Sequence, residues 1–412
     1  MRVFLDSLGC RLNEAELESW SSAFARRGHR VLAHPEDAEV VVLNTCAVTT
    51  QAARRSRKKT SALHAANPSA KLVLTGCYAE LAPDTVASLA GVDRVIGNRD
   101  KDALVEVVSA MFPDERPQRA QEPEATLFAR GRTRAFVKVA DGCRNRCSFC
   151  VVTVARGAER SVEIQAIVDQ VKQRYEEGVR EVVLTAVHLG GYGHDIGSTL
   201  TELIQTVLDE TAMPWIRFGS LEPWDLPDDF FALWEDPRLC PHLHLPLQSG
   251  CDGVLRRMAR RTTTALYRGL AGRAREAGID LTTDLIVGFP GETDDEFAAS
   301  LSFAEDMGFS DMHLFRYSAR EGTAAARMPR QVSGVVKRER MQRAQALSAR
   351  LRGDRLAREV GRWARVHWER DGRGYTDSYL RVVAGGPVPQ RNSFERLQVV
   401  GADSGALVVA RR

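Results

Sequence analysis

The sequence predicts an α/β protein with three parts: an N-terminal parallel-sheet α/β domain, a central incomplete barrel of six strand–helix units, and a small C-terminal β-barrel. Three observations predict this fold. Apolar strands alternate with helices over the first hundred residues, six further strand–helix units lie between residues 135 and 317, and only short strands follow residue 360. A length of 412 residues also suits two or three domains.

The N-terminal part, residues 1–111, repeats one unit: an apolar strand, a cysteine at its end and a helix. Strands are expected at residues 2–8, 39–43 and 71–74, and the cysteines that end them are Cys10, Cys46 and Cys77. Strands that alternate with helices form parallel sheets, whose carboxyl ends meet at one edge where ligands bind. We therefore expect these three thiols to lie close enough to share a ligand, with chance placement as the alternative.

An amphipathic helix is predicted after the first cysteine. Its apolar face consists of Leu17, Trp20 and Phe24. Asn13 and Glu16 occupy capping positions at its start, and Gly28 is expected to end it.

The central part, residues 133–350, follows a polar segment at 112–132 whose three prolines and weak periodicity predict a linker. Helical stretches, for instance at 161–177 and 293–307, separate six apolar runs. The predicted strands are residues 135–140, 181–187, 215–219, 242–247, 281–287 and 311–317. Six consecutive strand–helix units are enough for an incomplete α/β barrel, whose active-site loops follow the carboxyl ends of its strands.

The C-terminal part, residues 351–412, follows a basic helical stretch at 335–360. Short strands are expected at residues 363–368, 375–383, 396–400 and 406–410. This part carries 12 Arg, no Lys and 7 acidic residues, so its net charge is +5 within a chain of +3. A small basic β-barrel suits a polyanion such as nucleic acid. Its aromatic residues either stack on bases or form its core: Trp363, Trp368, Tyr375 and Tyr379.

Composition excludes a membrane protein. No stretch approaches the roughly 18 uninterrupted apolar residues of a membrane span, and the N-terminus reaches Asp6 without the apolar core of a signal peptide. We therefore expect a cytoplasmic protein. Eight cysteines in such a protein indicate metal or redox chemistry before disulfides. Cys240 and Cys251 lack cluster spacing and are expected to be structural.

The strongest chemical signal is a CxxxCxxC loop directly after the first predicted barrel strand, formed by Cys143, Cys147 and Cys150. Thiolates are the usual ligands of [4Fe–4S] clusters, and a complete set needs four. With three, one iron keeps an open position that can hold a substrate. A zinc knuckle is the alternative, but it would need a fourth protein ligand, and the nearest histidine is His188.

This loop resembles that of the radical S-adenosylmethionine superfamily in both spacing and placement. The resemblance implies that S-adenosylmethionine chelates the open iron and is cleaved to a 5′-deoxyadenosyl radical by one electron from a donor such as flavodoxin or ferredoxin. Residues after the other barrel strands are candidates for contacts with this cofactor: Gly190, Gly191, Glu222, Gln248 and Gly288. Each of these residues, like His188, also fits a purely structural role.

The segments around the N-terminal cysteines resemble the methylthiotransferases of that superfamily. These segments are residues 8–10 with Asn13, residues 44–46 and residues 75–77. The resemblance implies that Cys10, Cys46 and Cys77 hold an auxiliary [4Fe–4S] cluster with an open iron. It also implies that sulfur bound there is methylated by one S-adenosylmethionine and transferred to a carbon activated with another, and that the C-terminal part is an RNA-binding TRAM module.

Several segments resemble the branch of this family that modifies C2 of N6-threonylcarbamoyladenosine at position 37, in the anticodon loop of tRNA. They are residues 44–49, 53–57, 75–80, 246–250 and 317–323. The isopentenyladenosine branch has charges directly after the second cysteine, whereas residues 47–53 are uncharged here. That branch, the branch acting on a ribosomal-protein aspartate, and a non-catalytic RNA-binding redox-sensing iron–sulfur protein are the alternatives.

Two segments depart from the family pattern. Residues 153–157 lack the Pro-Tyr pair that commonly precedes Ala-Arg-Gly, and residues 188–191 replace a segment that usually contains Asn. A run of cations follows Cys46: Arg54, Arg55, Arg57, Lys58 and Lys59. These cations form either a solvated helix face or a set of contacts to tRNA phosphates.

Overall fold

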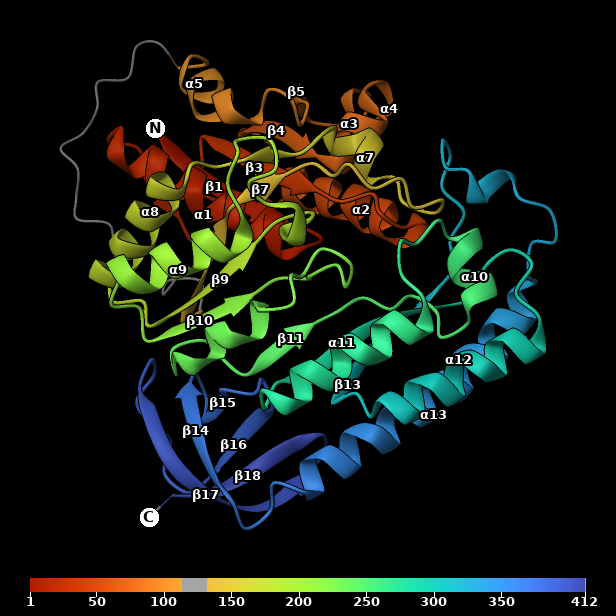
Figure 1. Ribbon diagram of the computed structural model, residues 1–412. Helices are drawn as coiled ribbons and strands as arrows, with labels where there is room; N and C mark the ends of the chain where they lie inside the picture. The colour runs from red at the N-terminus through yellow and green to blue at the C-terminus, as the bar shows by residue number, and fades with distance from the viewer. Residues whose placement is uncertain (113–131, 412) are drawn as a thin grey trace.

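The computed structural model describes residues 1–112 and 132–411 and has the predicted fold class (Figure 1). The N-terminal part is a parallel sheet of five strands in the order β2-β1-β3-β4-β5. Its strands are β1 (Arg2–Ser7), β2 (Arg30–Leu32), β3 (Val40–Thr45), β4 (Lys71–Gly76) and β5 (Val92–Ile96). Its helices are α1 (Arg11–Arg26), α2 (Thr50–Ala66), α3 (Cys77–Leu81), α4 (Pro83–Ala87) and α5 (Leu104–Ser109). Apolar clusters on both faces of the sheet bury β3 along its whole length.

The three predicted N-terminal strands are confirmed as β1, β3 and β4, but β2 and β5 were not predicted. β2 has only three residues, and β5 exposes Asp93 and Arg94, so neither forms a continuous apolar run. The predicted capping roles of Asn13 and Glu16 are wrong, because α1 already begins at Arg11. Both side chains are buried inside the first turns, where they bind other parts of the protein instead of free helix amides.

The central part is the predicted incomplete barrel of six parallel strands. They are β6 (Arg134–Lys138), β9 (Glu181–Thr185), β10 (Trp215–Phe218), β11 (His242–His244), β12 (Asp280–Val287) and β13 (Asp311–Arg316). They form two sheets, in the orders β10-β9-β6 and β11-β12-β13, which isolated bridges join between β10 and β11. β11 is shorter than predicted because Pro241 and Pro246, which cannot donate a backbone hydrogen bond, flank it.

Helices pack outside this barrel (Figure 1). The long ones are α8 (Ile164–Glu176), α9 (Leu200–Glu210), α11 (Thr264–Glu276), α12 (Asp294–Met307) and α13 (Gly334–Ala357). The short elements are β7 (Ala140–Asp141), α7 (Val152–Arg156), β8 (Arg160–Ser161), α10 (Asp252–Arg257) and four 3-10 turns, Lys101–Ala103, Leu189–Gly191, Phe230–Glu235 and Ala325–Arg327. α13 crosses residue 350, where we predicted a domain boundary, so the barrel and the C-terminal part share a helix. Residues 113–131 of the predicted linker lie outside the described residues.

The C-terminal part is a closed barrel in the order β14-β15-β16-β18-β17. Its strands are β14 (Trp363–Trp368), β15 (Arg373–Thr376), β16 (Arg381–Gly385), β17 (Phe394–Asp403) and β18 (Ala406–Ala410). The single strand predicted at 375–383 is wrong, because the chain turns after Thr376 and Tyr379 adopts a left-handed φ of 67°. Trp368 is buried in the barrel core, whereas Trp363 is 60% exposed.

The C-terminal barrel docks at the amino ends of the central strands. The buried Arg217 of β10 pairs with Glu181 of β9 at 2.6 Å and donates to the carbonyl oxygens of Thr376 and Asp377 at 2.8 and 2.6 Å. His367 of β14 hydrogen-bonds the same Glu181 at 2.7 Å. These buried charged contacts fix the C-terminal barrel below the central one. No helix in the described ranges is long and apolar enough to cross a membrane.

Candidate active site

Three strand-end loops of the N-terminal sheet bring Cys10, Cys46 and Cys77 to one wall of a single cavity. They follow β1, β3 and β4, which are neighbours in the sheet. Gly9 allows the close approach: at its φ of 115°, an added Cβ would lie 2.8 Å from the Sγ atom of Cys46. The predicted convergence of these thiols is therefore present in the structure.

Hydrogen bonds hold the Cys46 loop in place. The hydroxyl of Ser56, buried on α2, accepts from the Cys46 N–H at 3.1 Å and donates to the Cys46 carbonyl oxygen at 2.9 Å. Burial raises the pKa of the Cys46 thiol to about 11. A thiolate in this position needs a positive partner, which a metal centre supplies.

The second set of thiols lies on the loop between β7 and α7. The amide of Asn145 donates to the Sγ atom of Cys143 at 3.4 Å, and the amide of Val152 donates to that of Cys150 at the same distance. Burial raises the pKa of these two thiols to about 12 and about 11, respectively. Amide dipoles aimed at sulfur are the usual surroundings of a cluster ligand.

A buried cation lies beside the third thiol of this loop. The Arg260 guanidinium lies 3.8 Å from the Sγ atom of Cys147, donates to Glu222 at 2.8 Å, and stacks on Trp224 with 4.3 Å to the ring centroid. Glu222, predicted as a cofactor contact, therefore lies next to the CxxxCxxC loop and is held by Arg260. The loop combines soft thiolates, amide donors and one guanidinium, which fits a negatively charged iron–sulfur cluster.

Arg156 connects the two sets of thiols. It ends α7, the helix directly after Cys150, and its guanidinium donates to Glu16 and Asp141 at 2.9 Å and to the side-chain oxygen of Asn13 at 2.7 Å. Asn13 in turn donates to the carbonyl oxygens of Leu8 and Thr45, next to two of the N-terminal cysteines. This buried network fixes the N-terminal sheet against the barrel.

The cavity between the sheet and the barrel has a volume of about 490 Å³. Besides the three N-terminal cysteines, Val152 of α7 and residues of the barrel strands and their ends line it: Thr185, Gly219, His244, Asp284, His313 and Phe315. Val152 lies two residues after Cys150, so the cavity extends from one set of thiols to the neighbourhood of the other. Such a space can hold a cofactor and a substrate between two metal centres.

The predicted glycine contacts each have a packing partner in the structure. A Cβ at Gly190 would meet the Asp225 side chain, and a Cβ at Gly191 would meet Glu159 and His188. A Cβ at Gly288 would meet the Lys337 side chain at 2.4 Å. These contacts alone account for the glycines, and their role towards a cofactor stays a prediction.

Gln248 and His188 take different positions. Gln248 follows β11 with a left-handed φ of 71°, and its backbone bridges to β12 through bonds with Asp284 and Ile286. His188 is fully enclosed by Glu159, by Asp225 at 2.6 Å and by Asn145 at 3.1 Å. Burial lowers the pKa of His188, but the two carboxylates outweigh this and raise it. His188 thus has the hydrogen-bonded structural setting that was one of its two interpretations.

The predicted cations lie on α2, most of them facing solvent. Arg54, Arg55, Arg57 and Lys58 are exposed, whereas Lys59 pairs with Asp6 at 2.7 Å. Arg57 also donates to the Tyr78 hydroxyl at 3.1 Å. The helix begins at the cavity rim, since Val48 lines the cavity and Thr50 hydrogen-bonds Ser318 of the barrel at 3.2 Å.

Sequence reasoning missed the residues that complete this site. Arg156 appeared only within a family motif, Arg260 was not considered, and Asn13 was assigned to a helix cap. Their partners lie up to 143 positions away in the chain. One signal was available in the sequence. Asn13 and Glu16 lie on the same helix turns as its apolar residues, which predicts that these two polar side chains are buried and need polar partners.

Comparisons with known proteins agree with this arrangement. Residues 2–97 match the family described as Uncharacterized protein family UPF0004, and residues 137–304 match the Radical SAM superfamily. Over 97% of this chain and 94% of the relative, 32% of residues are identical to threonylcarbamoyladenosine tRNA methylthiotransferase MtaB of Bacillus subtilis. The chain belongs to the radical S-adenosylmethionine methylthiotransferase family.

Relatives with other substrates are similarly close. A tRNA-2-methylthio-N(6)-dimethylallyladenosine synthase of Jannaschia sp. is 33% identical over 98% of this chain and 93% of its own length. Ribosomal protein uS12 methylthiotransferase RimO of Roseiflexus castenholzii is 33% identical over 93% of this chain and 88% of its own. Identity therefore establishes the family of this methylthiotransferase without selecting its substrate.

A solved structure supports the fold. The radical S-adenosylmethionine methyltransferase TsrM of Kitasatospora setae superposes with a TM-score of 0.61 at 15% identity, over 79% of this chain and 77% of that chain. Family membership confirms the prediction of an enzyme that transfers methylthio groups. It also confirms S-adenosylmethionine and [4Fe–4S] clusters as cofactors, and the thiols, amides and guanidinium groups described above fit such clusters.

Proposed function

We propose that this methylthiotransferase adds a methylthio group to C2 of N6-threonylcarbamoyladenosine at position 37 of tRNA, with two [4Fe–4S] clusters and S-adenosylmethionine. One observation carries the proposal: three thiols on the N-terminal sheet line the cavity, and the second set of three lies on the loop before α7, whose Val152 lines the same cavity and donates to Cys150. Two tasks, sulfur supply and radical formation, need two such centres. A protein that only bound RNA would need neither.

In this proposal Cys10, Cys46 and Cys77 hold the auxiliary cluster, and Cys143, Cys147 and Cys150 hold the cluster that binds S-adenosylmethionine. When bound, the two clusters and S-adenosylmethionine would together supply sulfur, an electron and a carbon-centred radical. Arg156 and Arg260 balance the negative charge of the thiolates, and the network of Arg156 sets the distance between the two sets. Glu222 and Gln248 stay candidates for polar contacts with the cofactor.

The cavity offers apolar surface for the adenine base. Val48 and Phe315 line it and are 44% and 45% exposed, respectively, so each presents a free apolar side chain inside the cavity. Phe315 lies near the end of β13, two residues after His313. An aromatic ring in such a position can stack on a base and shield it from water.

The choice of nucleoside rests on two supports. The first relative reported above is named for threonylcarbamoyladenosine, and the stretch between Cys46 and the cations of α2 is uncharged, unlike the isopentenyladenosine branch. The predicted cytoplasmic location and the reduction by flavodoxin or ferredoxin belong to the same proposal. So does RNA binding by the C-terminal barrel, where Trp363 is exposed beside Arg396.

Exposed cations on α2 are proposed to contact tRNA phosphates. Replacing Arg54, Arg55 and Lys58 together by Gln is expected to weaken tRNA binding and to lower the slope of log affinity against log salt by about 1 to 3. A fluorescence anisotropy titration of labelled tRNA at several salt concentrations measures both quantities. The control replaces Arg338, Arg343 and Arg350 on α13, a helix that runs beside α12 on the outside of the barrel (Figure 1). An unchanged slope in the α2 variant would contradict this contact.

Nucleoside mass spectrometry tests the proposed function. Transfer RNA from cells that lack the gene is expected to lose the 2-methylthio derivative of threonylcarbamoyladenosine and to accumulate the unmodified nucleoside. The wild-type gene should restore the modification, and a gene encoding Cys147→Ala should not. An unchanged level of the derivative, or a loss of methylthio groups from isopentenyladenosine instead, would overturn the proposal.

A further inference from the structure

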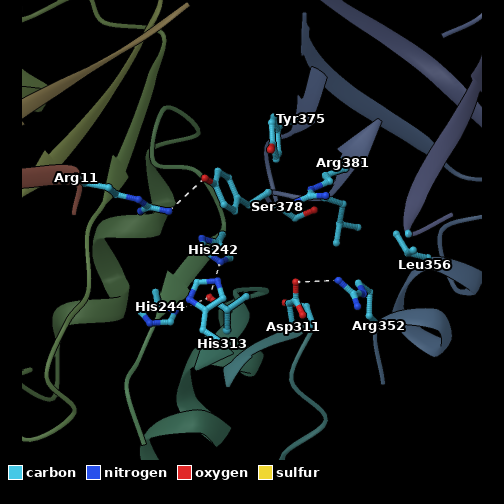
Figure 2. Close-up of a pocket in the computed structure, with 15 residues that line it drawn as sticks. Arg11, His242, His244, Asp311, His313, Arg352, Leu356, Tyr375, Ser378 and Arg381 are labelled. Atoms are coloured by element: carbon cyan, nitrogen blue, oxygen red, sulfur yellow. Dashed lines mark hydrogen bonds and ion pairs between the residues drawn. The ribbon is translucent and has the colours of Figure 1, made fainter. Parts of the chain in front are cut away.

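A second cavity lies below the one that contains the N-terminal cysteines. It has a volume of about 180 Å³ and is enclosed by the amino ends of β11, β12 and β13 and by the C-terminal barrel (Figure 2). Arg11, His244 and His313 line both cavities. The two cavities therefore adjoin at these three residues.

Cations without carboxylate partners distinguish this second cavity. The guanidinium of Arg11 donates to the Tyr379 hydroxyl at 3.2 Å and lies 5.6 Å from the ring centroid, and Arg381 lies on the facing β16 (Figure 2). In the described ranges neither arginine forms a salt bridge, whereas Arg352 at the cavity floor pairs with Asp311 at 3.5 Å. The cavity therefore has an excess of positive charge.

The acidic group in the wall of the first cavity has partners other than Arg11. Asp284 accepts from His244 at 3.1 Å and lies 3.4 Å from His313, and the rings of these two histidines stack. Among the described residues, Asp284 pairs with these two histidines and not with Arg11. Burial would raise the pKa of Tyr379, but arginines around it, Arg11 among them, lower it, which indicates a positive potential.

The geometry of the purine ring relates its C2 atom in the first cavity to its N6 substituent near the second. In adenosine, C2 and the exocyclic N6 lie on the same edge of the ring, separated by N1. If C2 faces the cysteine wall, the N6 substituent points along that edge. Arg11 directly follows Cys10 in the chain and lines both cavities, so it lies where this substituent would pass.

We infer that the cavity of Arg11 and Arg381 binds the threonyl carboxylate of N6-threonylcarbamoyladenosine and selects this nucleoside over neutral N6 derivatives. The inference rests on the proposed function and assigns the residues that determine its specificity. Guanidinium groups bind carboxylates in a bidentate fashion. A neutral substituent such as dimethylallyl would form no ion pair with the half-buried Arg11 or the exposed Arg381, which is how a polar site disfavours an apolar analogue.

The experiment compares two substrates that differ only in this charge. The full-length reconstituted enzyme receives anticodon stem–loop RNA that carries either threonylcarbamoyladenosine or its methyl ester, and mass spectrometry gives kcat/KM for methylthiolation. The wild type is expected to prefer the free acid by about 10- to 100-fold. Arg11→Gln and Arg381→Gln should each lower kcat/KM for the acid by about 10-fold or more and reduce the preference towards one.

Controls separate this role from structural effects. Arg373→Gln, on β15 and outside the cavity, should keep the wild-type preference. Iron content shows whether Arg11→Gln disturbs the adjacent cluster. If iron is lost, the substrate preference of Arg381→Gln, which lies in a different part of the chain, tests the carboxylate contact instead. Equal losses on both substrates, or a wild-type enzyme that uses acid and ester equally well, would overturn the inference while the proposed function stands. A wild-type enzyme that modifies neither would overturn both.

Discussion

Cys46→Ala is expected to abolish methylthio transfer while the release of 5′-deoxyadenosine continues, whereas Cys147→Ala should abolish both. The reason is spatial separation. Cys46 lies on the wall formed by the N-terminal sheet, held by Ser56, and Cys147 lies on the loop between β7 and α7, beside Arg260. Loss of one ligand from three removes the cluster that it belongs to and leaves the other loop intact.

The measurement uses anaerobically reconstituted protein with dithionite and S-adenosylmethionine, and follows 5′-deoxyadenosine and methylthiolated RNA by mass spectrometry. Iron content should fall to roughly half in each variant, since each retains one of two clusters. Cys240→Ala serves as the matched control, because Cys240 is buried in the barrel away from both sets of thiols. Full methylthio transfer by Cys46→Ala would refute the assignment of the auxiliary cluster.

Arg156→Met is expected to lower the free energy of unfolding by about 1.5–3 kcal/mol, because the buried Glu16 and Asp141 lose charged hydrogen bonds. Lys101 at 2.7 Å from Glu16 and Lys138 at 3.5 Å from Asp141 stay as their partners. Arg156 is 3% exposed and lies 2.9 Å from both carboxylates. Thermal unfolding should show a Tm that is lower by about 2–4 °C. Arg160→Met is the control: Arg160 is 47% exposed on its side chain and 3.9 Å from Asp141, so its loss should cost less than about 1 kcal/mol.

The same variant has a defined pH dependence. Burial would raise the pKa of Glu16, but Lys101 and Arg156 hold it well below the ordinary range. A depressed carboxyl pKa stabilises the fold above the ordinary value, and this contribution is lost as pH falls through the folded-state pKa. The difference in stability between wild type and Arg156→Met should therefore shrink on acidification below about pH 4. A difference that stays constant with pH would show that Arg156 acts through packing alone.

Local patterns predicted most of the fold. The apolar runs in β3, β4 and β9 are continuous, so the chain itself shows where each of these strands lies. Prediction failed where a short or exposed strand lacks this pattern, as in β2 and β5. It also failed at 375–383, where apolar and aromatic residues on both sides of a turn look like one strand.

The candidate site, like the fold, was predictable from the sequence only in part. The spacing of Cys143, Cys147 and Cys150 is local and directly readable, and the position of Cys10, Cys46 and Cys77 at strand ends follows from the logic of a parallel sheet. The predicted glycines were harder to interpret, because a glycine before a helix serves packing and ligand approach equally well. The structure shows the packing partner of each one.

The sequence by itself determined most of the strands and helices, the family and the six thiols proposed to hold two clusters, because strand periodicity and motif spacing are properties of neighbouring residues. Only the tertiary structure decided which charged groups surround those thiols. Arg156 reaches Asn13 across 143 positions, and Arg11 meets Tyr379 across 368. Such contacts depend on how the sheets pack and on which guanidinium groups become buried. No local sequence pattern encodes the packing or the burial.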